Sequence, residues 1–152
     1  MCYKILCILA CTKPNTMNPI LRNIIAVIVG VVACMGTNMF IIGISGKIIP
    51  LPEGVDPNNL ESIKENLHLY EFKHFIMPFL AHALGSLVGA FLAALIAATK
   101  KMTFAYTIGC FHLLGGIAAA MMIPGPTWFI VVDLVLAYIP MAWIGGKLVK
   151  KK

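Results

Sequence analysis

The chain has 152 residues, of which 60% are hydrophobic and only 12% are charged, and its mean hydropathy is +0.91. Soluble domains usually carry about 25% charged residues, so this composition excludes an ordinary soluble globular domain. The net charge of +6 does not indicate nucleic-acid binding, because the basic residues stand beside long apolar segments and not on a polar face. The composition predicts a polytopic integral membrane protein.

The first 16 residues, MCYKILCILACTKPNT, do not fit the pattern of a membrane-crossing segment. Their one apolar run, at 5–10, is too short to cross a bilayer, and with a single lysine before it the run lacks the features of a signal peptide. A lipoprotein-like cleavage site before Cys11 is a weaker alternative. We expect residues 1–16 to form a flexible cytoplasmic tail, with Met17 as the alternative start of translation.

The first predicted span covers about 20–49. It begins after Asn18 and Pro19, a polar cap followed by a proline that suits the first helical turn. Small residues then recur at every fourth position, and this spacing brings Asn38 onto the same face of the helix. The residues that share this face are Ala26, Gly30, Cys34 and Asn38.

The loop at about 50–74 contains five of the six acidic residues. Asp56 followed by Pro57 is a favourable helix start, and apolar residues recur after it on one helical face. We therefore predict a short amphipathic helix at about 57–68, capped by Asp56 and lying at the mouth of the bundle or in the membrane interface. The apolar face consists of Leu60, Ile63, Leu67 and Tyr70.

The second predicted span covers about 75–99 and carries no formal charge. Its 25 residues correspond to a helix of roughly 37 Å, enough to cross a hydrocarbon core of about 30 Å. Two adjacent rows of small residues run along it, and such rows allow close helix packing, either within the chain or between copies in a small homo-oligomer. One row consists of Ala81, Gly85, Gly89, Ala93 and Ala97, and the other of His82, Ser86, Ala90, Ala94 and Ala98.

Two further spans follow, at about 103–123 and 127–146. In the third span Gly109, His112 and Gly116 share a face that we expect to contact other helices. The fourth span carries Asp133, the only acid within any span, and Pro140 should kink it because proline cannot donate a hydrogen bond to the carbonyl of Leu136.

The basic residues predict the orientation of these spans. Nine of them fall on the side of the chain ends and of the turn between the second and third spans, against three on the other side. Because cytoplasmic loops carry the excess of lysine and arginine, both termini are predicted to be cytoplasmic and the acidic loop to face outward. The nine are Lys4, Lys13, Arg22, Lys100, Lys101, Lys147, Lys150, Lys151 and Lys152; the three are Lys47, Lys64 and Lys73.

Four polar residues within the spans form the candidate site, namely Asn38, His82, His112 and Asp133. Ionisable groups at membrane depth are costly and commonly functional. Counting from the outer ends of their spans places His82 and Asp133 at the same depth of roughly 10 Å, so that they can pair, whereas His112 is expected nearer the middle of its span. The pair could handle protons or cations, or the polar groups could simply satisfy one another and fix the helix register. We favour the structural interpretation.

The sequence contains no motif that predicts enzymatic activity, and we expect neither a cofactor nor a bound metal. No nucleophile elbow, phosphate loop or nucleotide fingerprint is present. Haem or zinc is a weak alternative, because the two histidines of the spans are expected at different depths and a zinc site needs three or four converging ligands.

Several segments resemble a group of small four-span bacterial integral membrane proteins that have no assigned activity. The resemblance covers about 17–148 and implies four spans in a bacterial inner membrane, with no catalytic or binding residue to carry over. The segments are MNPILRN at 17–23, LPEGVD at 51–56, PFLAHALG at 78–85, PGPTWF at 124–129 and AYIPMAWIGGKL at 137–148.

The sequence thus predicts an all-α transmembrane four-helix bundle over 17–152. Its expected function is that of a non-enzymatic structural or interaction protein in contact with the lipid bilayer and not with nucleic acid. The alternative is a small proton- or cation-coupled transporter or channel-like subunit that uses Asp133 with His82.

Overall fold

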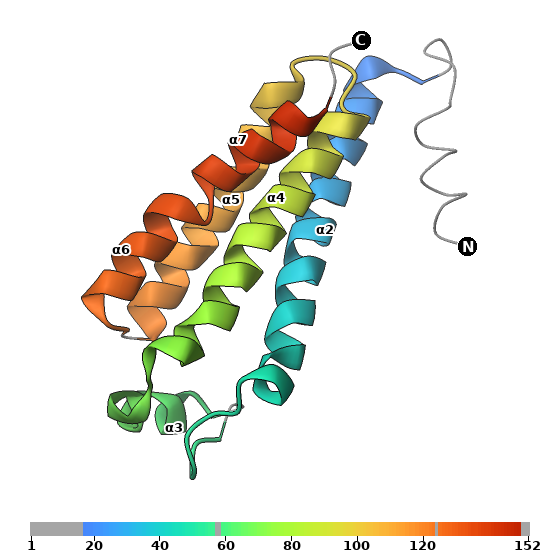
Figure 1. The fold of residues 1–152 in the computed structure, drawn as a ribbon. Helices are drawn as coiled ribbons and strands as arrows, with labels where there is room; N and C mark the ends of the chain where they lie inside the picture. Colours follow the sequence, from blue (N-terminus) through green and yellow to red (C-terminus); the bar gives the residue numbers. More distant parts are fainter. Residues whose placement is uncertain (1–16, 57–58, 124, 150–152) are drawn as a thin grey trace.

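The structure is a computed structural model that describes residues 17–56, 59–123 and 125–149. The tail predicted for residues 1–16 lies outside these residues. In the described parts the regular elements are all helical, and Figure 1 shows the long helices side by side as a bundle with one short helix beyond its lower end. The predicted all-α four-helix bundle is confirmed. The elements are α2 (Pro19–Ile48), α3 (Leu60–Glu65), η1 (Leu67–Leu69), η2 (Phe72–Phe75), α4 (Ile76–Ile96), α5 (Lys101–Met122), α6 (Thr127–Leu136) and α7 (Ile139–Leu148).

Within the described residues, four helical segments are long and apolar enough to cross a membrane, and these are Pro19–Ile48, Phe72–Ile96, Lys101–Met122 and Thr127–Leu148. The shortest has 22 residues, which corresponds to roughly 33 Å of helix and exceeds a hydrocarbon core of about 30 Å. Large apolar side chains are exposed along the outside of the bundle, where water would be unfavourable and lipid favourable. They include Ile24, Ile28, Val32, Leu114, Met121, Val131 and Val135.

Small residues bring the helix backbones into close contact inside the bundle. A Cβ atom on Gly89 of α4 would lie 2.6 Å from the carbonyl oxygen of Gly30 in α2, and one on Gly145 of α7 would lie 2.5 Å from the carbonyl oxygen of Leu87. Any larger side chain at these positions would push the helices apart. Both small-residue rows of α4 therefore pack against helices of the same chain, namely α2 and α7. The buried small residues of the first row are Ala81, Gly85, Gly89, Ala93 and Ala97.

The first turn of α2 caps the end of α4. The Arg22 guanidinium donates from Nε to the carbonyl oxygen of Ile96 at 2.6 Å, and Asn23 Oδ1 accepts from the backbone N–H of Ala98 at 2.8 Å. The first contact satisfies one of the carbonyl groups that a helix C-terminus leaves without an intrahelical partner, and the second holds the backbone just beyond the helix end. Lys100 then adopts a left-handed conformation with φ of 44°, and α5 begins at the next residue.

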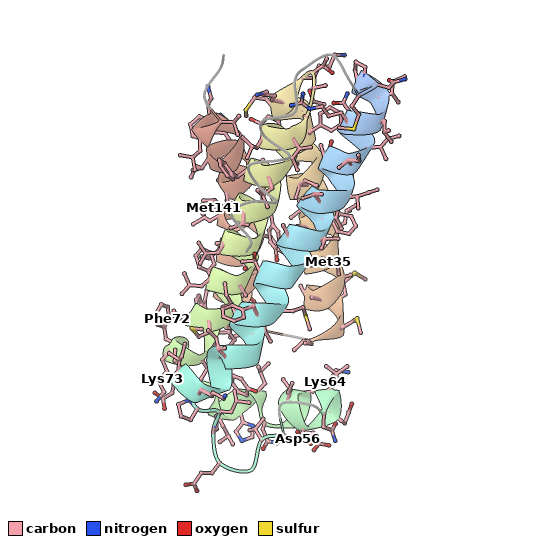
Figure 2. The ribbon with its side chains drawn as sticks, turned by 90° about the vertical axis from the view of Figure 1, so that its right-hand side faces the viewer. Met35, Asp56, Lys64, Phe72, Lys73 and Met141 are labelled. Atoms are coloured by element: carbon pink, nitrogen blue, oxygen red, sulfur yellow. The ribbon has the colours of Figure 1, made fainter. Side chains whose placement is uncertain are left out.

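The short helix of the acidic loop is smaller than predicted. Helix α3 begins at Leu60, and its cap is Asn59, whose Oδ1 accepts from the N–H groups of Glu61 and Ser62 at 2.9 and 3.3 Å. The prediction of Asp56 as the cap of this helix is therefore wrong, because the asparagine directly before Leu60 reaches the first-turn amides. The predicted start at residue 57 lies outside the described residues. Figure 2 shows Asp56 and Lys64 together at this end of the molecule.

The fourth span is broken into α6 and α7, where the sequence predicted a kink. Pro140 has no N–H to donate to the carbonyl of Leu136, and the helical hydrogen bonding stops there. Tyr138, between the two helices, has φ of −110° and ψ of −76° and its side chain is fully buried. The break thus directs a tyrosine into the bundle interior.

The described charges are divided between the two ends of the bundle. In Figure 1 the start of α2, the turn between α4 and α5 and the end of α7 lie at one end, and the loop with α3 lies at the other. Arg22, Lys100, Lys101 and Lys147 belong to the first end. The five acids of the loop belong to the second, together with Lys47, Lys64 and Lys73, so only Asp133 carries an acidic group into the spans.

Candidate functional site

The four polar residues predicted from the sequence come together in the interior of the bundle. Asn38 extends from α2, His82 from α4, His112 from α5 and Asp133 from α6. Ser86 of α4 and Tyr138 of the α6–α7 break join them through hydrogen bonds. Each of the four described helical segments that could cross a membrane therefore contributes at least one polar group to one cluster.

Asp133 is buried and fully paired, with 4% of its surface exposed. His82 Nδ1 lies 2.9 Å from Oδ1 and 3.0 Å from Oδ2 of the carboxylate, and the Tyr138 hydroxyl donates to Oδ2 at 2.8 Å. A buried carboxylate is tolerated only when its partners replace the hydrogen bonds of water, and His82 of α4 and Tyr138 of the same fourth span do so here. An ionised carboxylate can only accept, so Nδ1 of His82 carries a hydrogen and donates it, and in the neutral imidazole Nε2 then has a free lone pair.

His112 is paired on both ring nitrogens. Its Nε2 lies 3.0 Å from Asn38 Nδ2, which is a donor, and its Nδ1 lies 2.9 Å from Ser86 Oγ. Nε2 must therefore accept, and Nδ1 carries the hydrogen and donates to the serine. This pairing ties α2, α4 and α5 to one imidazole and leaves His112 no free nitrogen. Ser86 receives the hydrogen bond and is not activated as a nucleophile by this arrangement.

The aromatic rings of the cluster pack against one another. The ring centroids of His82 and His112 are 5.9 Å apart at an interplanar angle of 89°, and those of His112 and Tyr138 are 5.2 Å apart at 81°. The prediction that the two histidines lie at different depths is therefore wrong. The helical segment that contains His82 begins at Phe72, ten residues earlier, and His112 stands ten residues before the end of α5 at Met122, so the two are equally far from the ends of their helices.

Gly116 makes room for the buried tyrosine. A Cβ atom at Gly116 would overlap the Tyr138 hydroxyl and its ring carbon Cζ. Gly109, seven residues earlier on the same face of α5, instead lets α5 approach α7, since a Cβ atom there would lie 2.6 Å from the Cβ of Ala142. The two glycines predicted as packing positions thus serve different contacts, and only Gly116 belongs to the polar cluster.

A groove of about 510 Å³ lies between α2 and α5 beside this cluster. His82, with 19% of its side chain exposed, belongs to the groove lining together with Asn38 and His112, whereas Asp133 and Tyr138 do not. The carboxylate is thus separated from the groove by the His82 ring. The remaining lining residues are Met35, Met39, Phe111, Leu114, Gly115, Gly116 and Ala119.

Ser86 and Tyr138 are the site residues that the sequence did not identify. Ser86 stands four residues after His82 and therefore on the same helical face, which was a usable signal. Tyr138 reaches Asp133 only because the helix is interrupted between them, so no regular helical spacing predicts the contact.

Neither a metal site among the described residues nor a known relative assigns a function to this cluster. Among the residues described, no three histidine, cysteine, aspartate or glutamate side chains are placed to hold one metal ion. Comparison with protein families, curated proteins and solved structures found no match to this chain. The resemblance to four-span bacterial membrane proteins stays a prediction.

Proposed function

We propose that this chain is a non-enzymatic, multi-pass integral protein of a bacterial inner membrane, in which the polar cluster holds the four spans in register. The apolar outer surface supports membrane insertion, because Met121 and Leu114 are among the most exposed of the large apolar side chains that the structure describes. The lipid bilayer is its proposed surroundings. A homo-oligomer would have to form through faces other than the small-residue rows of α4, which α2 and α7 already cover.

The observation that carries this proposal is the complete pairing of Asp133. Both of its oxygens accept hydrogen bonds, and the carboxylate does not line the groove. A carboxylate that binds a transported ion needs a free oxygen and a path to water. Asp133 instead resembles a structural cross-link between α4, α6 and the α6–α7 break, and polar contacts of this kind stabilise helix association within lipid.

The proposed orientation places both chain ends in the cytoplasm. It is supported by the position of Arg22, Lys100, Lys101 and Lys147 at one end of the bundle, opposite the acidic loop. Trp128 and Trp143 stand near opposite ends of the fourth span, as expected for side chains at the two membrane interfaces. Lys147 makes a cation–π contact with Trp143, its Nζ lying 5.6 Å from the ring centroid.

Proton or cation coupling is the second candidate, and the accessible His82 ring is the observation that favours it. Flux in proteoliposomes distinguishes the two functions when the native chain is compared with Asp133→Asn. We expect no proton or cation flux from either protein, together with a lower unfolding stability of the variant. Flux through the native chain that disappears in a stably folded Asp133→Asn variant would establish the transport function instead.

A further inference from the structure

The groove between α2 and α5 has a polar floor with unused hydrogen-bonding capacity. His82 Nε2 and Asn38 Oδ1 accept no hydrogen bond from any of the described residues, whereas Nδ1 of His82 and Nδ2 of Asn38 are paired. Among the described residues no buried side-chain nitrogen or oxygen lacks a partner, so these two atoms must be accessible. Both residues line the groove, which is therefore where the two acceptors can be reached.

The walls of the groove are apolar and face outward. Met35, Met39, Phe111 and Leu114 are all more than 45% exposed and continue the apolar outer surface of α2 and α5. Met35 is labelled at mid-length on α2 in Figure 2. Methionine and phenylalanine form adaptable linings for apolar ligands, and the volume of about 510 Å³ lies within the usual range for small-molecule sites.

The depth of the floor restricts the head group of a ligand. His82 lies ten residues from the start of its helical segment at Phe72, or roughly 15 Å along the helix. A phosphate at this depth would be far from water, would lie close to Asp133, and would offer acceptors where the floor also offers acceptors. A neutral head group that donates hydrogen bonds avoids all three costs.

We propose that this groove binds a neutral, lipid-soluble molecule whose hydroxyl head donates to His82 Nε2 or Asn38 Oδ1 and whose apolar tail lies against the methionine and phenylalanine side chains. Asp133 prepares the site, because its bond to Nδ1 leaves Nε2 as the acceptor nitrogen of the neutral His82 ring, the form that this proposal requires. The ligand enters from the side, between α2 and α5, and not along the bundle axis. This inference rests on the proposed membrane insertion of the bundle.

The chain offers a matched pair of variants for the test. Gly115 lines the groove, and a Cβ atom placed there has no neighbour within 4 Å, so Gly115→Leu puts a larger side chain into the groove without displacing a neighbour at its Cβ. Gly36 of α2 is equally unobstructed but does not line the groove, so Gly36→Leu is the control for the same change on an exposed helix face. Leucine favours a helix over glycine, and we expect both variants to fold.

The experiment uses the full chain in phosphatidylcholine nanodiscs with a photoreactive long-chain alcohol and, separately, its methyl ether. We expect the alcohol to label groove residues about two- to tenfold more than the ether, the ratio that one hydrogen bond gives. Gly115→Leu should abolish this labelling and Gly36→Leu should retain it. In ¹⁵N-histidine spectra the His82 Nε2 signal should move with the alcohol and not with the ether.

Three results would overturn the inference. Equal labelling by the alcohol and the ether would mean that the groove holds a lipid tail without recognising its head. Labelling that survives Gly115→Leu would place the bound molecule elsewhere. A native chain that cannot be recovered in nanodiscs would contradict the proposed membrane function itself, and this inference would fail with it.

Discussion

At the scale of single residues, the cluster contains two histidines that differ in how many of their ring nitrogens are hydrogen-bonded. His112 has both nitrogens engaged, by Asn38 and Ser86, and acts as a fixed connection between helices. His82 is held on one nitrogen by Asp133 and keeps the other accessible. The difference follows from the partners, since an aspartate on one nitrogen sets the state of the other.

The contact between Gly116 and Tyr138 gives a test at this scale. Gly116→Ala places a methyl group on the Tyr138 hydroxyl, so the tyrosine must move away from Asp133. We expect the free energy of unfolding in detergent micelles to fall by about 1–3 kcal/mol, the usual range for overpacking. The neighbouring Gly115→Ala, which meets nothing within 4 Å, should be neutral or stabilising. Equal effects of the two changes would show that Tyr138 does not occupy the position described.

How far the site could be predicted depends on how regular the backbone is. The polar residues of α2, α4 and α5 follow helical spacing, so their inward faces could be read from the small residues around them. Tyr138 could not, because its contact with Asp133 depends on the break before Pro140. The prediction that His82 and His112 lie at different depths was wrong, because the depth of His82 was counted from residue 75 and the helical turn that begins at Phe72 was left out.

At the scale of helices, close backbone contact and end capping decide how the spans fit together. The spacing of small residues in α4 predicted its packing faces, but only the structure shows that α2 and α7 cover them. Arg22 entered the sequence argument as a marker of orientation, and the structure gives it a second role at the end of α4. A capping contact between residues 74 positions apart has no local sequence signal.

Arg22 gives a test at this scale. Arg22→Ala removes the donor to the Ile96 carbonyl, and Lys47→Ala removes a basic residue from the last turn of α2, at the opposite end of that helix. We expect Arg22→Ala to lower the free energy of unfolding by about 1–2 kcal/mol and to speed amide hydrogen exchange around 97–100. Lys47→Ala should change neither. Unchanged exchange in Arg22→Ala would show that the cap does not hold this turn.

At the scale of the whole molecule, an apolar exterior surrounds an interior of mostly small apolar residues that holds one polar cluster. The composition alone predicted the apolar exterior, because too few charged residues are present to cover a water-facing surface. Of the described basic residues, Arg22, Lys100, Lys101 and Lys147 lie at one end, and Lys47, Lys64 and Lys73 lie with the acids of the loop at the other. The proposed orientation depends on the excess of lysine and arginine at the first end, counted over the whole sequence.

Site-directed labelling tests the proposed orientation. In a cysteine-free background, Lys64→Cys near α3 and Lys101→Cys at the start of α5 lie at opposite ends of the bundle. A membrane-impermeant maleimide should label Lys64→Cys on intact bacterial cells and Lys101→Cys only after permeabilisation. The reverse pattern would invert the topology, and labelling of both on intact cells would contradict the membrane location of the bundle.

The central claim is that the contact between His82 and Asp133 stabilises the bundle, and a double-mutant cycle measures it most directly. The free energy of unfolding in bicelles is determined for the native chain, His82→Leu, Asp133→Leu and the double variant. Because each single change leaves a buried polar group without its main partner, we expect the double variant to lose at least about 1 kcal/mol less than the two single losses combined. Losses that add to within about 0.5 kcal/mol would contradict the claim and show that the two side chains do not stabilise each other.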